Sequence, residues 1–215
     1  MNNYAVYIAG MFEDEKHPLF FEIKKFLKNI GWNCVFIKLY DNDKQFGSYS
    51  FKSEMERITD YIERIHPDLI VAHSIGGYIA TQLSTRGFLF LLDPSLSVSD
   101  VILPNVKNGR YDDGKYVMDL SNEFLESIKT CASIEKNGKN IKQGENVFIF
   151  GAGKGGFKVA EQYHKNILDS HYFFLADANH DFSAAKDKKK IINLIKKRLG
   201  VKSPSRKVSD RIMSL

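Results

Sequence analysis

The sequence contains few cysteines and no long apolar run. Only two of its 215 residues are cysteine, and Cys34 and Cys131 belong to no CxxC pattern or Cys/His cluster. Neither a disulfide framework nor a zinc site is therefore expected. No apolar segment approaches the ~18 residues that a membrane-spanning helix needs, and no basic segment is followed by the apolar core of a signal peptide. These absences predict a soluble, cytoplasmic protein without a membrane span.

The charge of the chain is positive and unevenly placed. The net charge is +5, and much of the excess lies in residues 186–190, 196–198 and 206–207. Basic patches attract nucleic acid or anionic membranes, but no aromatic residues on which bases would stack are interleaved here. We expect no nucleic-acid partner. With 43% apolar residues, the chain is expected to form one domain over residues 1–200, followed by a basic, flexible tail over 201–215.

Short apolar runs alternate with helical patterns along most of the chain. Because the runs are apolar throughout, rather than at every second residue, they are typical of parallel strands covered on both faces. The pattern therefore predicts an α/β fold: a three-layer α/β/α sandwich around a six-stranded, mostly parallel sheet. The strands are expected at residues 4–9, 32–39, 68–73, 88–92, 146–150 and 171–176, and the helix after the third strand is expected to end at about 86–87.

The alternation of strand and helix patterns stops after the fourth strand. Residues 95–119 are polar and contain the turn signal Asn108-Gly109, which predicts a hairpin or an irregular excursion. A helical pattern with Leu120, Phe124 and Ile128 on one face follows. We interpret residues 95–140 as an insertion after the fourth strand.

Residues 68–80 contain the most informative local pattern. A β-branched apolar run ends at His73-Ser74, and a pattern of small helical residues begins at once. In such a strand–turn–helix unit the serine occupies a tight, strained turn. Its Oγ stands clear of the sheet, and N–H groups of the helix start point into the same space. Gly76 and Ala72 lie two positions away on either side, where larger side chains would collide. Ser74 is therefore a candidate nucleophile.

This elbow at the third of six strands, with an insertion after the fourth, resembles a compact α/β-hydrolase that lacks the first two strands of the full fold. The resemblance covers most of the chain, from residue 4 to about residue 200. It implies that the strands, numbered along this chain, lie in the order 2-1-3-4-5-6. It also implies that the insertion over 95–140 covers the site as a cap.

The resemblance also assigns partners to the serine. The family places its histidine in the loop after the last strand, which here contains His180, so His180 is the expected general base. His73 is expected to be structural, with its side chain turned away from the attacking side. The oxyanion is expected to bind the backbone N–H groups of Ile75, directly after the serine, and Met11, at the end of the first strand.

The acid that orients the histidine departs from the family pattern. Its usual position, the loop at 151–156, contains no carboxylate. A second location known in the fold, the end of the strand after the nucleophile helix, holds Asp93, although Leu-Asp-Pro is also an ordinary turn sequence. Asp93 is the expected acid. The alternatives left open are a site without an acid and the residues Asp177, Asp181, Asp112, Asp113 and Asp119.

The same loop carries a second motif. Gly151-x-Gly153-x-x-Gly156 follows a predicted strand and opens a helix, and Asp177 ends the next strand. This spacing of glycines and acid matches the dinucleotide-binding fingerprint. Such a fingerprint normally lies at the first strand of its fold, however. Lys154 is followed by glycine rather than Ser or Thr, so the loop is not a Walker loop.

Together these observations predict a serine hydrolase that cleaves a carboxylic ester or a thioester through an acyl-enzyme on Ser74. A small-molecule acyl substrate and no metal or cofactor are expected. The alternatives are a dinucleotide-binding protein that uses the loop at 151–156, and a non-catalytic protein of the same fold. Tyr111, Tyr116 and Phe124 are candidates to line an acyl pocket; the alternative is that they form the insertion's own small core.

Overall fold

A parallel sheet forms the centre of the molecule. The computed structural model describes residues 3–40, 46–83, 87–131, 146–151, 156–167 and 170–201. Within them, six parallel strands lie in the order β2-β1-β3-β4-β8-β9, which confirms the predicted order. The strands are β1 (Tyr4–Ile8), β2 (Asn33–Ile37), β3 (Leu69–His73), β4 (Phe88–Leu92), β8 (Val147–Gly151) and β9 (His171–Leu175).

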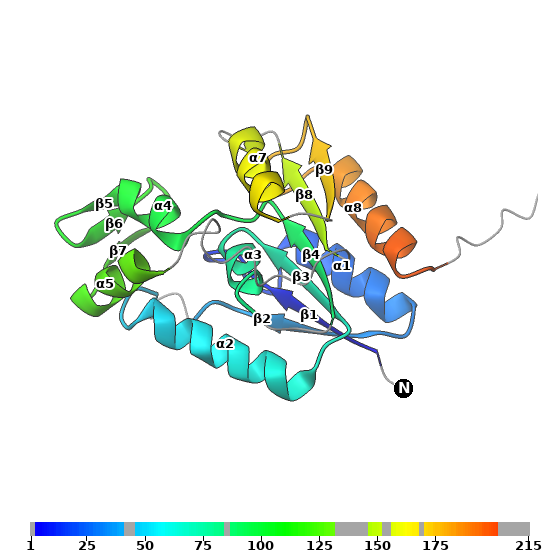
Figure 1. Ribbon diagram of the computed structural model, residues 1–215, viewed down its shortest axis with the longest axis horizontal. Coiled ribbons are helices and arrows are strands. Elements are labelled where there is room, and N and C mark those ends of the chain that lie inside the picture. Colours follow the sequence, from blue (N-terminus) through cyan, green and yellow to red (C-terminus); the bar gives the residue numbers. More distant parts are fainter. Residues whose placement is uncertain are drawn as a thin grey trace, which may run out of the picture.

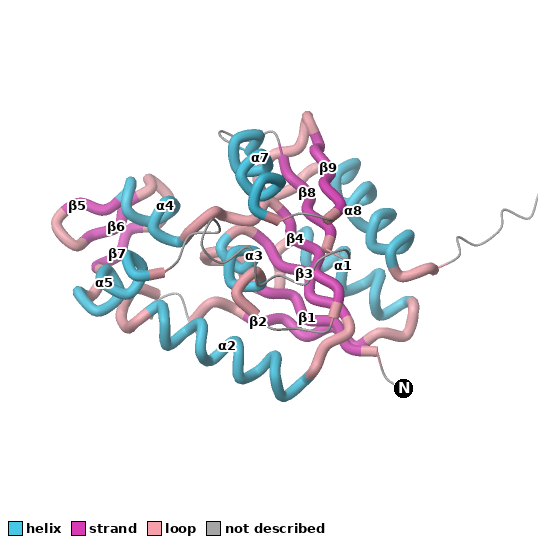
Figure 2. Tube along the Cα trace, viewed as in Figure 1, coloured by secondary structure: helices cyan, strands magenta, loops and turns pink. Residues whose placement is uncertain are grey.

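Helices cover both faces of this sheet. On one face lie α1 (Pro18–Asn29) and α8 (Ala185–Arg198), and on the other lie α2 (Phe51–Ile65), α3 (Ile75–Ala80) and α7 (Gly156–Asn166) (Figure 1 and, coloured by secondary structure, Figure 2). The predicted three-layer α/β/α sandwich is therefore confirmed. None of the helices in the described part of the chain has both the length and the apolar character that crossing a bilayer requires.

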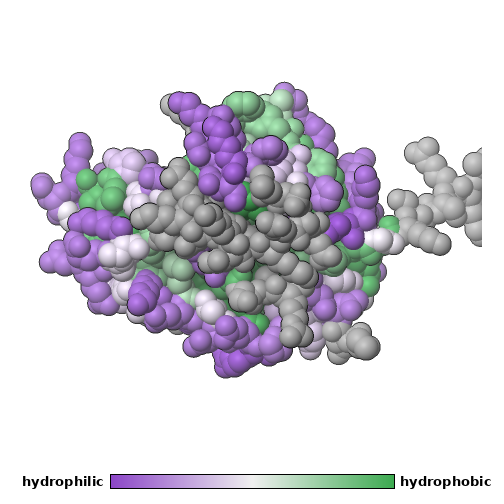
Figure 3. Space-filling view, in the orientation of Figure 1, coloured by the Kyte–Doolittle hydropathy of each residue, from purple (hydrophilic) through white to green (hydrophobic). Residues whose placement is uncertain are grey.

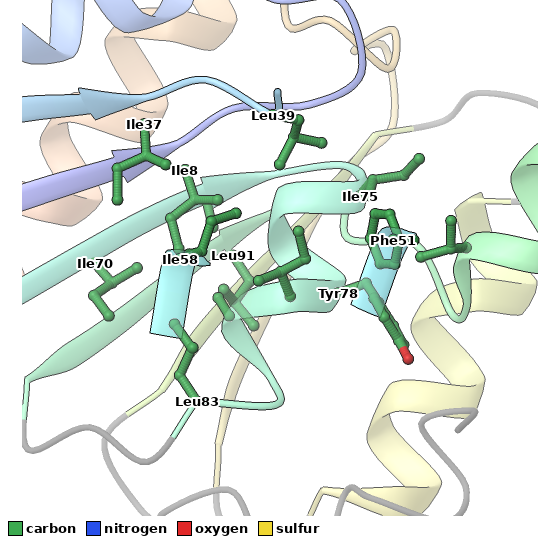
Figure 4. Packing of buried hydrophobic residues seen from close by; sticks show 14 of the residues in the cluster. Ile8, Ile37, Leu39, Phe51, Ile58, Ile70, Ile75, Tyr78, Leu83 and Leu91 are labelled. Atoms are coloured by element: carbon green, nitrogen blue, oxygen red, sulfur yellow. The ribbon is translucent and has the colours of Figure 1, made fainter. Parts of the chain in front are cut away.

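Apolar side chains fill the space between sheet and helices. Successive residues of β1, β3 and β4 point alternately into two clusters, and the central strands are buried on both faces. Figure 4 shows one cluster, in which Ile8, Ile70 and Leu91 from three neighbouring strands meet Ile58 of α2 and Tyr78 of α3. Each such buried side chain contributes about 1.5–3 kcal/mol of transfer free energy. The carboxyl ends of these strands are therefore firmly supported.

The helix after the elbow is shorter than predicted. It ends at Ala80 rather than at residues 86–87, and residues 84–86 lie outside the described part. At Thr81 the side-chain hydroxyl donates to the carbonyl oxygen of Tyr78 at 2.6 Å, and the backbone turns. Serine and threonine hydroxyls compete with the helix for backbone groups in this way.

The insertion between β4 and β8 folds into a small unit of its own, grouped at one end of the molecule beside α2 (Figure 1). Asn108 (φ 51°) and Gly109 (φ 76°) form the tight turn that the sequence predicted. The turn joins the first two strands of a three-stranded antiparallel sheet. Residues 132–140 of the insertion and 202–215 of the predicted tail lie outside the described residues. The elements are α4 (Val98–Ile102), the 3₁₀ helix η2 (Leu103–Asn105), β5 (Val106–Lys107), β6 (Arg110–Asp112), β7 (Val117–Asp119) and α5 (Asn122–Thr130).

Two hydrogen bonds help to fasten the insertion to the rest of the molecule. The backbone N–H of Phe51, at the start of α2, donates to Ser127 Oγ of α5 at 2.8 Å. The N–H of Ser121, the residue that caps α5, donates to the carbonyl oxygen of Gly47 at 2.8 Å. The start of α2 is thereby held against α5.

Apolar side chains are exposed at the edge strand β9, on the opposite edge of the sheet from β2. Phe173 and Phe174 of the edge strand β9 are 37% and 44% exposed, and Phe157 of α7 lies against Phe174 with ring centroids 5.9 Å apart. In Figure 3 hydrophobic colour gathers at the top of the view, where α7 and β9 lie. None of the five residues of β9 is Asp, Glu, Lys or Arg, the side chains that commonly protect edge strands.

Candidate active site

Ser74 lies at the turn between β3 and α3, at the carboxyl edge of the sheet. Its backbone has φ 54° and ψ −122°, a conformation that costs a non-glycine residue about 1–3 kcal/mol. The turn requires Gly76, because a Cβ there would lie 2.3 Å from the carbonyl oxygen of Ala9. Close packing of α3 on the end of β1 therefore fixes the strained turn, as expected for an elbow.

His180 and Asp93 complete a hydrogen-bonded chain with this serine. His180 Nε2 is 3.0 Å from Ser74 Oγ, and His180 Nδ1 is 2.6 Å from Asp93 Oδ2. A carboxylate accepts hydrogen bonds, so Nδ1 carries the hydrogen and Nε2 of the neutral ring is free to accept from the serine hydroxyl. The structure brings together the three side chains that the sequence nominated.

Asp93 is itself held in place. Its residue follows β4 with φ 43°, its N–H donates to the carbonyl oxygen of Ile149 at 2.7 Å, and its Oδ1 accepts from the N–H of Gly151 at 3.3 Å. Its side chain is 8% exposed, whereas that of His180 is 48% exposed. The carboxylate is therefore shielded from water while the imidazole is accessible.

Other acids considered from the sequence have different partners. Asp177 is 75% exposed and pairs with Lys186 at 3.2 Å. Asp113 accepts a hydrogen bond from the Tyr111 hydroxyl inside the insertion. Among the described residues, Asp93 is the acid that hydrogen-bonds the His180 ring.

The loop after β1 runs directly beside the nucleophile. A Cβ on Gly10 would lie 3.2 Å from the Cβ of Ser74, so a larger residue would crowd the two segments. Met11 follows in this loop, and Ile75 is the first residue of α3. Met11 is thus one residue beyond the point where this loop contacts Ser74, and Ile75 is bonded directly to Ser74. That their N–H groups bind an oxyanion remains a prediction.

A cavity of about 350 Å³ opens beside the three side chains. It differs from the predicted acyl pocket, because Tyr111 and Phe124 are buried within the hydrophobic core and Tyr116 packs on Phe12 with ring centroids 4.1 Å apart. Aromatic rings are stabilised by tilted contacts with other rings, and here the partners are Phe12 and Phe46. Besides Ser74, Asp93 and His180, the described lining residues are Pro94, Ser95, Leu96, Asp100, Val101, Gly156 and Val159.

Solved structures share this architecture. Est1E from Butyrivibrio proteoclasticus, in a structure with ferulic acid bound, superposes with a TM-score of 0.73 and 10% sequence identity, over 92% of this chain and 90% of its own. The chain has the fold of the α/β-hydrolase superfamily. The α/β-hydrolase domain-containing protein 10 from mouse (TM-score 0.70, 10% identity, 92% and 89% covered) agrees. So does the enol-lactonase from Burkholderia xenovorans LB400 (0.66, 13% identity, 93% and 92% covered).

Sequence comparison adds nothing to this likeness. No protein-family model matches the chain, and no curated protein matches it. At identities this low the likeness establishes the α/β-hydrolase fold, and the chemistry has to be argued from the site.

One feature of this site could not be predicted from the sequence. His73 is 2% exposed, and its Nδ1 lies 2.5 Å from Oε1 of Glu13, which is 7% exposed. Burial opposes charge on both groups, but their attraction outweighs it: the pKa of His73 is raised to about 9 and the pKa of Glu13 is lowered to about 2. The only sequence signal was a carboxylate three residues after Gly10, in a loop that looked merely acidic.

The glycines at the two described ends of the glycine-rich loop, Gly151 and Gly156, have structural explanations. A Cβ on Gly156 would lie 2.2 Å from the carbonyl oxygen of Gly151, and a Cβ on Gly151 would lie 2.9 Å from that of Asn179. These two glycines allow Gly151 to lie close to Asn179, beside His180, and Gly156 to lie close to Gly151. Gly153 and Lys154, on which dinucleotide binding would depend, lie outside the described residues. In the described part of the chain, no three His, Cys, Asp or Glu side chains are grouped to hold a metal ion.

Proposed function

We propose that the protein is a serine hydrolase that cleaves a carboxylic ester or a thioester through an acyl-enzyme on Ser74. The observation that carries the proposal is the continuous hydrogen-bonded chain from Ser74 Oγ through the His180 ring to Asp93. A nucleophile, a base and a group that orients the base are the three parts that acyl transfer needs, and their order here is the productive one.

The first half of the reaction transfers the acyl group to the enzyme. Ser74 Oγ attacks the carbonyl carbon while its proton passes to His180 Nε2, and Asp93 stabilises the imidazolium that forms. The backbone N–H groups of Ile75 and Met11 hold the negative oxygen, each for about 3 kcal/mol of transition-state stabilisation. The C–O or C–S bond then breaks, and His180 returns the proton to the alcohol or thiol that leaves.

The second half releases the acyl group. Water takes the place of the leaving group, and its oxygen attacks the acyl carbon while His180 Nε2 takes its proton. The bond between the acyl carbon and Ser74 Oγ then breaks, and His180 returns the proton to Oγ, which gives the carboxylic acid and the free Ser74 hydroxyl. The half-exposed imidazole allows this water to reach Nε2, whereas the buried Asp93 keeps its charge unscreened.

A small acyl compound is the proposed substrate. The cavity of about 350 Å³ is at the low end of the range for small-molecule sites. Two structural neighbours favour oxygen esters over thioesters: Est1E in its structure with ferulic acid, and the enol-lactonase. The reaction as written needs no metal or cofactor.

Labelling with a fluorophosphonate tests the proposal. These reagents phosphonylate an activated serine, so we expect one adduct, located by peptide mass spectrometry on Ser74. Ser74→Ala should lose it, and Ser53→Ala, an exposed serine of α2, should keep it. A folded wild-type protein that takes no label and hydrolyses no short p-nitrophenyl ester would leave the fold without the proposed activity.

A further inference from the structure

The buried pair of Glu13 and His73 connects three separate segments. Glu13 Oε2 accepts a hydrogen bond from the N–H of Gly10 at 2.6 Å, in the loop after β1. Glu13 Oε1 faces His73 Nδ1, directly before the nucleophile, although the two residues are 60 positions apart in the sequence. His73 Nε2 lies 2.8 Å from the backbone carbonyl oxygen of His180. One ion pair thus holds the predicted oxyanion loop, the elbow and the loop of the base.

We propose that the Glu13–His73 pair is a positioning device that keeps these three segments in the arrangement that acyl transfer requires. The inference rests on the function proposed above and adds to it two residues outside the Ser74–His180–Asp93 chain. Glu13 and His73 act through the groups that they hold, so they are positioning residues rather than catalytic ones.

The hydrogen-bond partners define the charge of His73. A backbone carbonyl only accepts, so Nε2 must carry a hydrogen; an ionised Glu13 also only accepts, so Nδ1 must carry one as well. His73 is therefore an imidazolium that Glu13 compensates inside the protein. The raised pKa of His73, about 9, and the lowered pKa of Glu13, about 2, agree with this assignment. Removing one partner leaves an uncompensated buried charge.

His180 is consequently fixed at two points. Asp93 holds its ring through Nδ1, and His73 holds its backbone through the carbonyl oxygen. Catalytic groups must be held within about 0.5 Å of the productive geometry, and a displacement of about 1 Å can cost 10²-fold in rate. Loss of the hydrogen bond between His73 and the His180 carbonyl oxygen would let the imidazole of His180 move relative to Ser74.

The pair should respond to alkaline pH. Burial raises the pKa of Tyr7 well above 10 and lowers that of His17, so neither changes charge between about pH 7 and 10. As pH rises through about 9, His73 loses a proton. If the proton leaves Nε2, the hydrogen bond to the His180 carbonyl oxygen is lost. If it leaves Nδ1, a lone pair on that nitrogen faces the Glu13 carboxylate. The titratable groups around the pair are Tyr7 on β1, His17 before α1, Asp93 after β4, and His180 and Asp181 after β9.

Two substitutions of Glu13 distinguish a positioning role of this residue from a purely structural role. In Glu13→Gln the amide N–H can donate to a neutral His73, and the amide oxygen can still accept from Gly10. In Glu13→Ala both bonds are lost. We expect the rate constant of fluorophosphonate labelling at pH 7.5 to fall about 10²-fold in Glu13→Ala and less than about tenfold in Glu13→Gln. The wild type should lose reactivity above about pH 9, and Glu13→Gln should not.

The control is Glu15→Ala, because Glu15 lies in the same loop, is 64% exposed and pairs with Lys24 at the surface. It should be labelled at the wild-type rate. A wild type without label would overturn the proposed function and this inference with it. A labelled wild type with Glu13→Ala at the same rate, or Glu13→Gln with an unchanged fall near pH 9, would overturn the inference alone. If circular dichroism shows that Glu13→Ala does not fold, the pH profile of Glu13→Gln decides.

A spectroscopic readout tests the charge without any activity. In ¹⁵N spectra of the histidine rings, assigned through His73→Asn, both nitrogens of His73 should be protonated at pH 7.5 and titrate near 9. Titration near the ordinary value of 6.5 would overturn the inference.

Discussion

Replacing Ser74 by alanine is expected to lower kcat for a p-nitrophenyl ester by about 10⁶-fold, to the rate that the remaining site gives without a nucleophile. The substitution removes one oxygen and keeps the Cβ, so neither the packing of α3 nor the strained turn has to change. The loss should therefore lie in kcat, because the cavity that binds the substrate remains.

Steady-state rates of purified wild type and Ser74→Ala, with thermal unfolding of both, check this expectation. The unfolding temperatures should agree closely while the rates differ by orders of magnitude. A Ser74→Ala protein that kept more than about a tenth of the wild-type rate would place the nucleophile on another residue.

Replacing Asp93 by asparagine is expected to lower kcat by about 10⁴-fold. The asparagine would offer an N–H to His180 Nδ1, which favours the ring tautomer whose Nε2 carries hydrogen and cannot accept from Ser74. Asparagine tolerates positive φ values such as the 43° found here, so the fold should survive.

The matched control is Asp177→Asn, an exposed acid beyond the end of β9 that pairs with Lys186. It should retain the wild-type kcat within about twofold, because exposed ion pairs contribute little. If Asp177→Asn lost turnover and Asp93→Asn did not, the acid of the site would be misassigned.

The fold could be predicted because its signals are local. Apolar runs such as 69–72 indicate buried parallel strands, and Pro18 marks the start of a helix that the structure has at that residue. The end of α3 at Ala80 was missed, because a threonine hydroxyl ends the helix and no glycine or proline announces it.

The candidate site could be predicted only in part. Ser74 and His180 stand in sequence contexts that themselves define a turn and a loop, and the structure brings both together with Asp93. The pairing of Glu13 with His73 depends on two segments that meet only when β1 and β3 lie side by side. No local pattern carries that information.

The cavity is the least predictable part. Besides Ser74 and His180, its lining comes from the turn after β4, from the start of the insertion and from α7, whereas aromatic residues farther along the insertion were predicted. Sequence shows that Tyr111 and Phe124 are apolar, but which partner each ring finds depends on tertiary packing. Here they meet Phe12 and the rings beside it.

Trapping the acyl-enzyme is the most direct test of the proposed mechanism. The wild-type protein would be mixed with a short p-nitrophenyl ester, quenched in acid within milliseconds, digested and analysed by mass spectrometry. We expect the peptide that contains Ser74 to gain the mass of the acyl group, with a burst of p-nitrophenol that matches the enzyme concentration. Turnover without any acylated Ser74, or with the acyl group on another residue, would contradict the mechanism.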